Sequence, residues 1–157
     1  HRMMEASFYK GVAYVNPDIE TTAITTGDWA DTVKAREACL AVIAQGYDVL
    51  FPCLDAAGAG VAAAAQDSGN VKVVGAVADY ARDYGAEDVT AGSVVFAWDE
   101  LGYLETKGEL CDGRSHVLGM KENGIRPVIN IELTSEQQAV YDAAVADLLA
   151  GKIDIAD

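Results

Sequence analysis

Short β-branched and apolar runs alternate with helical patterns along most of the chain, and this alternation limits the fold more than any other feature of the sequence. Helices are expected at residues 2–14, 31–45, 60–68, 99–109 and 135–150. Strands are expected at residues 19–26, 48–53 and 71–77, and within 89–98. Strands that alternate with helices predict an α/β fold, with a mostly parallel sheet and helices on both of its faces.

The end of the chain departs from this alternation. Residues 115–120 and 127–133 predict two further strands, joined through a turn at Asn123 and Gly124, a dipeptide that strongly favours tight hairpins. The following helix begins with a capping motif, because Thr134 and Ser135 are each followed three residues later by a glutamine. We therefore expect a C-terminal hairpin and helix.

Composition narrows the class of protein. With 157 residues, 51% of them hydrophobic, the chain is long enough for one α/β domain with a proper core. No apolar run approaches the length of about 18 residues that a membrane-spanning helix needs. Acidic residues outnumber basic ones by 25 to 11, for a formal charge of −14. Nucleic-acid binding requires a basic surface, so no nucleic-acid partner is expected.

Cysteine and histidine residues form no metal or redox motif. The cysteines Cys39, Cys53 and Cys111 match neither a zinc-site spacing nor a CxxC pair, and small buried side chains are the favoured interpretation. The histidines His1 and His116 lie far apart in the sequence. No Ser-His-Asp, Cys-His or carboxylate pair stands out, so we expect no catalytic residue, no metal and no cofactor.

Ligands of parallel α/β sheets bind beyond the carboxyl ends of the strands. Trp29, in a loop after the first expected strand, can stack on a planar ligand or pack at the edge of the core. Asp79, at the end of the strand over residues 71–77, can accept two hydrogen bonds from a diol or cap the segment that follows. The sequence leaves both pairs of alternatives open.

A glycine-rich loop offers an enzyme-like alternative. Gly58, Gly60 and Ala63 match a GxGxxA dinucleotide fingerprint after a strand, with Asp79 near the position of a ribose-binding carboxylate. In that fingerprint the first glycine directly follows the strand, whereas residues 54–57 intervene here. The pattern therefore favours a plain loop of small residues over a pyrophosphate cradle.

Five segments form an ordered set of motifs that covers nearly the whole chain. They are GVAYVNP at residues 11–17, TGDWADTVKA at 26–35, the strand and glycine-rich loop at 47–60, GAVAD at 75–79 and LAGKI at 149–153. In order and spacing they resemble the basic membrane protein family, the substrate-binding lipoproteins of ABC transporters. Many members of that family bind nucleosides.

The resemblance implies a periplasmic-binding-protein fold of two α/β lobes, with the solute held between them. It assigns residues 1–110 to the ligand-binding region of the second lobe. It assigns residues 111–157 to a C-terminal hairpin and helix that pack at the hinge or on the first lobe. The opening sheet of the first lobe is missing, and the chain starts in a helical pattern, so the protein is expected to extend upstream.

The resemblance also implies site residues. Asp79 matches the carboxylate that holds a ribose, and Trp29 matches an aromatic loop position. The other expected lining residues are Leu54, Asp55, Tyr80 and Phe96. Two positions depart from the family pattern, because Phe96 stands where a lysine is frequent and Val77 replaces an aspartate. Both changes make the pocket less polar and favour a more aromatic or apolar solute.

These observations together predict an extracytoplasmic solute-binding protein of an ABC importer that captures a nucleoside, a purine-like compound or another small aromatic solute. Its partners would be the transporter permease and the missing N-terminal lobe. It would be periplasmic or extracellular and membrane-anchored, with its signal and anchor upstream of this sequence. The alternatives are a nicotinamide-dependent enzyme that uses Gly58 and Gly60, and a stand-alone ligand-sensing module.

Overall fold

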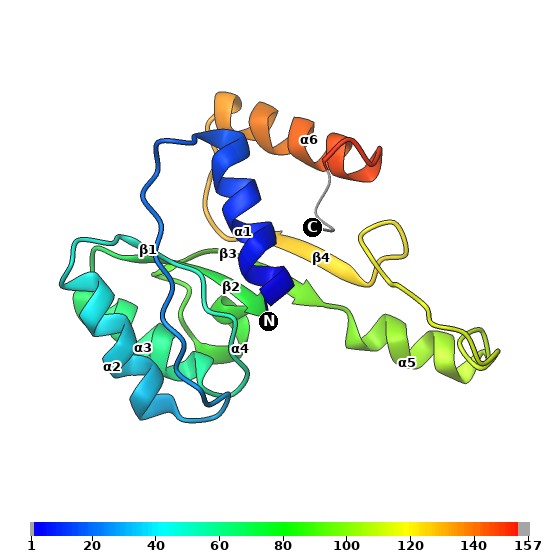
Figure 1. The fold of residues 1–157 in the computed structure, drawn as a ribbon, viewed down its shortest axis with the longest axis horizontal. Coiled ribbons are helices and arrows are strands. Elements are labelled where there is room, and N and C mark those ends of the chain that lie inside the picture. Colours follow the sequence, from blue (N-terminus) through cyan, green and yellow to red (C-terminus); the bar gives the residue numbers. More distant parts are fainter. Residues whose placement is uncertain (1, 154–157) are drawn as a thin grey trace. The chain divides into compact units, whose positions relative to one another are not determined.

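The computed structural model describes residues 2–153, which divide into two compact units (Figure 1). Residues 28–131 form one unit, here called the sheet unit, and residues 2–27 with 132–153 belong to the other, here called the helical unit. The boundary expected at residue 110 falls inside the sheet unit. The expected packing of residues 111–157 at a hinge or on a first lobe stays a prediction.

The sheet unit contains four strands in the order β1-β2-β3-β4: β1 (Val49–Leu50), β2 (Lys72–Val77), β3 (Thr90–Phe96) and β4 (Ile125–Ile129). The first three are parallel, and β4 runs antiparallel to β3. The predicted α/β class with a mostly parallel sheet is confirmed. The strand expected at residues 48–53 is shortened, and Val49 is exposed because β1 lies at the edge of the sheet.

The helices of the sheet unit are α2 (Thr32–Ile43), α3 (Gly58–Ser68), α4 (Tyr80–Tyr84) and α5 (Trp98–Thr106). Asp31 caps α2, since its side chain accepts a 2.9 Å hydrogen bond from the Lys34 amide. Alanines on α2 and α3 join Leu50, Val73 and Tyr80 in one buried core. Small side chains allow α2 and α3 to pack closely, which explains the alanine- and glycine-rich sequence of α3.

Two expected strands are wrong. Residues 19–26 are exposed over most of their length and pair with no strand, because β-branched residues form a strand only where a partner strand is available. The C-terminal hairpin is also wrong: residues 115–120 are not a strand, and β4 instead pairs with β3, with Ile125 opposite Phe96. The Asn123-Gly124 turn does form, but it closes a loop on Gly119, whose carbonyl oxygen accepts a 2.8 Å hydrogen bond from Gly124.

The helical unit consists of α1 (Arg2–Val15) and α6 (Ser135–Leu149), joined to the sheet unit through extended segments. The hydroxyl of Tyr14 donates a 3.3 Å hydrogen bond to Asp147. Thr134 and Gln137 form the expected capping box at the start of α6. Among the side chains described in this unit, none is fully buried. Two helices without a sheet of their own leave apolar side chains partly uncovered.

In residues 2–153, no helix combines the length and apolarity that a bilayer crossing requires.

Removing the α6 cap gives a first testable result. We expect Thr134→Ala to destabilise α6 by about 1 kcal/mol, because the Gln137 amide loses its acceptor. Hydrogen exchange at the first turn of α6 measures this loss. Ser135→Ala, one position further along, is the matched control and should change exchange little. Equal protection in the two variants would show that the capping box contributes nothing.

Candidate functional site

The carboxyl ends of β1, β2 and β3 lie at one edge of the sheet, since these three strands are parallel. Val77 at the end of β2 lies opposite Val95, so Phe96 follows directly on the neighbouring strand. The loop that carries Asp79 and the end of β3 therefore share the edge where parallel sheets bind ligands.

Val77 makes a sharp turn at this edge. Its φ of 73° is rare for a β-branched residue, and the Ala78 amide donates a 2.9 Å hydrogen bond to the Ala76 carbonyl oxygen across it. This hydrogen bond closes a strained three-residue γ-turn. Backbone strain of this kind costs on the order of 1–3 kcal/mol and concentrates at functional positions. The turn directs the chain straight from β2 into the residue that precedes α4, which is Asp79.

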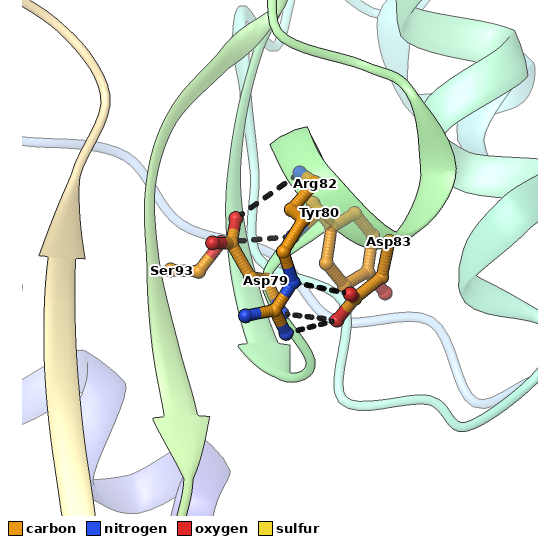
Figure 2. Close-up of polar contacts among 5 residues, drawn as sticks. All are labelled: Asp79, Tyr80, Arg82, Asp83 and Ser93. Carbon is orange, nitrogen blue, oxygen red and sulfur yellow. Dashed lines mark hydrogen bonds and ion pairs between the residues drawn. The ribbon is translucent and has the colours of Figure 1, made fainter.

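Asp79 is the N-cap of α4, so the capping alternative is confirmed (Figure 2). Its Oδ1 accepts a hydrogen bond of only 3.4 Å from the Arg82 amide, which leaves Oδ2 without a hydrogen-bond partner in the described part of the chain. The Arg82 side chain points to Asp83 instead, with its Nε 2.7 Å from Oδ1 of that carboxylate. That ion pair lowers the pKa of Asp83. Capping α4 therefore leaves Oδ2 of Asp79 able to accept further hydrogen bonds.

Tyr80 does not line a solute pocket, and that expectation is wrong. Its side chain is completely buried, and its amide donates a 3.1 Å hydrogen bond to Oγ of Ser93 on β3 (Figure 2). Its ring meets Tyr84 edge to face, with the centroids 4.8 Å apart. Burial raises the pKa of Tyr80, whose hydroxyl has no hydrogen-bond partner among the described residues. Tyr80 thus anchors α4 to the sheet from inside the core.

Trp29 lies in a loop that is tied to the loop after β1. Its carbonyl oxygen accepts a 2.9 Å hydrogen bond from the Ala57 amide, while its side chain is 52% exposed. Asp28 holds the loop by accepting hydrogen bonds from the Ala30 and Asp31 amides, and these bonds lower the pKa of Asp28. The Trp29 side chain is therefore not a buried core residue, and its stacking on a ligand stays a prediction.

The loop after β1 places its two expected site residues differently. The Asp55 carboxylate is exposed, and its main-chain oxygen accepts a 3.2 Å hydrogen bond from the Tyr84 hydroxyl. Leu54 is half-buried and packs against the core. Asp55 is therefore exposed at the end of this loop, whereas Leu54 mainly supports the loop.

Gly58 and Gly60 are packing positions. A methyl group at Gly58 would lie 2.8 Å from Cζ of Tyr80, and one at Gly60 would lie 2.9 Å from the carbonyl carbon of Thr32. Both glycines are buried. Protein atoms thus occupy the space beside these glycines that a pyrophosphate would need, so the geometry does not support the nicotinamide-dependent alternative.

Phe96 borders an apolar groove of about 180 Å³, here called the β3 groove. Its lining residues are Phe96, Ala97, Trp98, Leu101, Leu118, Gly124 and Ile125. Only Phe96 among them was predicted from the sequence, and Gly124 and Ile125 reach β3 because β4 pairs with it. A second aromatic residue, Trp98, stands two positions after Phe96 at the start of α5, and it is the sequence feature that could have indicated this groove.

Among the described residues, the cysteine and acidic side chains form neither a disulfide nor a metal site. No disulfide joins Cys39, Cys53 and Cys111. Cys39 packs against the core, and this burial raises the pKa of its thiol to about 11, which disfavours the thiolate. Within residues 2–153, no three His, Cys, Asp or Glu side chains gather as a metal site would require.

The folded chain is similar to two solved structures. It superposes on an ABC transporter solute-binding protein from Conexibacter woesei DSM 14684 with a TM-score of 0.66, 21% identity and coverage of 95% of this chain and 52% of that one. The structure of a transcriptional activator of the comK gene from Bacillus halodurans matches with a TM-score of 0.65, 22% identity and coverage of 77% and 43%. These likenesses show that the chain has the fold of one part of each of these longer proteins.

Sequence comparison identifies the family. Residues 2–155 match the Bmp family model, described as ABC transporter substrate-binding protein PnrA-like, and the chain belongs to this family. It is 28% identical to Basic membrane protein D of Borreliella burgdorferi strain JD1 over 152 residues, which are 92% of this chain and 44% of that protein. The chain thus spans less than half the length of this relative. The family is one of binding proteins, in line with the expectation of no catalysis.

Proposed function

We propose that the sheet unit is the second lobe of an extracytoplasmic solute-binding protein of an ABC importer, which holds a nucleoside-like or other small aromatic solute between two lobes. The observation that carries the proposal is Asp79, a half-buried carboxylate at the carboxyl edge of the sheet with Oδ2 unpaired in the described part of the chain. A carboxylate of this kind accepts hydrogen bonds from a diol. Trp29 and Asp55 are exposed on loops tied to the same edge.

The exposed apolar side chains of α1 and α6 support the proposed partners. α1 and α6 expose Val15 and Val140 and contain no fully buried side chain among the described ones, as expected of helices that cover the sheet of another lobe. That lobe and the transporter permease are the proposed macromolecular partners. The proposed location is outside the cytoplasm, with a membrane anchor.

The contribution of Asp79 to solute binding can be tested separately from its role as the N-cap of α4. We expect Asp79→Ser to weaken adenosine binding by about tenfold or more, because the serine caps α4 but removes the charged acceptor. Isothermal titration of the two-lobed protein that contains this chain with adenosine, guanosine and uridine measures the affinity, and thermal unfolding measures the cap. Asp79→Ala should lose both affinity and stability.

The matched control is Asp88→Ser, which changes an exposed carboxylate before β3 and should leave the affinity unchanged. Heat with no member of the panel, or equal affinities in wild type and Asp79→Ser, would count against the proposed function.

A further inference from the structure

The β3 groove is preformed by backbone contacts. Phe96 lies opposite Ile125 in the β3–β4 ladder, and the Ala97 amide extends that ladder with a 3.0 Å hydrogen bond to the Gly124 carbonyl oxygen. A methyl group at Gly124 would lie 2.8 Å from the carbonyl carbon of Leu118. Glycine at this position therefore lets Leu118 approach and form the far wall, so no rearrangement is needed to open the groove.

An ion-pair cluster outside the groove holds α5 in place. Nη1 of Arg126 on β4 lies 2.8 Å from Oδ2 of Asp99, and its Nε donates a 3.0 Å hydrogen bond to Asn123. This contact lowers the pKa of Asp99. The charges next to the groove are thus paired with one another, and Trp98, immediately before Asp99, is held at the groove margin.

The groove itself contains no charged side chain, in a protein with a formal charge of −14. Its only polar side-chain group is the indole N–H of Trp98. Phe96 and Trp98 meet edge to face with centroids 5.9 Å apart, and Trp98 remains 63% exposed. An ionised ligand group would lose its hydration here without gaining a partner, whereas a neutral ring would bury apolar surface on both aromatic side chains.

We propose that the β3 groove binds the uncharged aromatic ring of the solute, while the hydroxyl-bearing part of the same solute reaches Asp79. This inference rests on the proposed function and names a second contact region for it. The volume supports it, since a dry cavity of about 150 Å³ lined by aliphatic and aromatic residues holds one benzene ring. The position supports it too, because β3 ends beside β2 at the ligand-binding edge.

Amide chemical-shift mapping of the ¹⁵N-labelled chain tests this assignment. Adenosine and adenine are expected to shift the Ala97, Gly124 and Ile125 amides and the Trp98 indole N–H, whereas ribose should not. Adenosine shifts confined to Trp29, Asp55 and Asp79 would overturn the groove assignment and leave the proposed function standing. No shift with any of the three probes would count against both.

Variants give an independent measurement. Trp98→Leu is expected to weaken adenosine binding by about tenfold. Tyr103→Leu is the matched control on the same helix, because Tyr103 is 55% exposed and lies outside the groove lining, and it should bind as wild type does. Gly124→Ala, which displaces Leu118, should weaken adenosine and adenine equally. Unchanged affinity in both Trp98→Leu and Gly124→Ala would overturn the inference.

Discussion

Replacing Gly60 with alanine is expected to lower the free energy of unfolding by about 3 kcal/mol. The added methyl group would lie 2.9 Å from the Thr32 carbonyl carbon and nearer still to its oxygen. These are backbone atoms at the first residue of α2, so no side-chain rotation relieves the overlap. α2 and α3 must separate, and the buried alanine contacts between them weaken. Urea unfolding followed by circular dichroism measures the loss.

Gly102→Ala is the matched control for this prediction. Gly102 also lies inside a helix of the sheet unit, but a methyl group there meets nothing within 4 Å. Alanine is the better helix former by about 1 kcal/mol, so this variant should be as stable as the wild type or more stable. If Gly60→Ala behaved like Gly102→Ala, the close packing of α3 on α2 would be wrong.

Gly58→Ala is expected to lower the free energy of unfolding by about 2 kcal/mol through overpacking against Tyr80. The new methyl group would lie 2.8 Å from Cζ of the Tyr80 ring and closest to its hydroxyl oxygen. Tyr80→Phe alone should raise stability by about 1 kcal/mol, since it removes a buried hydroxyl that has no partner in the described residues. The sign is informative, because losing a tyrosine hydroxyl would ordinarily remove a hydrogen bond.

The double variant Gly58→Ala/Tyr80→Phe separates the two effects. Without the hydroxyl the methyl group has more room, so the cost of Gly58→Ala should fall by about 1 kcal/mol in the Tyr80→Phe background. Urea unfolding of the four proteins completes the cycle. Strictly additive changes would mean that Gly58 and Tyr80 are not in contact. A loss of stability in Tyr80→Phe would mean that its hydroxyl is hydrogen-bonded.

Local sequence signals located most helices. The capping motif at Thr134 is one such signal, because a cap depends only on residues three positions apart, and its side chain accepts a hydrogen bond from the first turn of α6. The parallel strands β2 and β3 were expected for a similar reason, since both end in a short run rich in valine. The ordered motifs also indicated the family that the comparison then established.

Strand pairing could not be predicted from local sequence in the same way. Residues 19–26 have the composition of a strand but no partner, whereas residues 125–129, with a proline at position 127, pair with β3. Whether an extended segment joins a sheet depends on a free strand edge elsewhere in the chain, and local composition carries no information about that edge. The β3 groove was missed for this reason, because its second wall exists only once β4 pairs with β3.

The same distinction between local sequence and tertiary contacts applies to the roles of the site residues. The sequence by itself determined the α/β class, the cap of α6, the likeness to solute-binding proteins and the position of Asp79 after a strand. Only the tertiary structure decided that Tyr80 faces the core, that Gly58 and Gly60 are packing positions, and that Phe96 borders an apolar groove. The physical reason is that residue type and spacing set local hydrogen bonding, whereas burial and contact depend on segments brought together from distant parts of the chain.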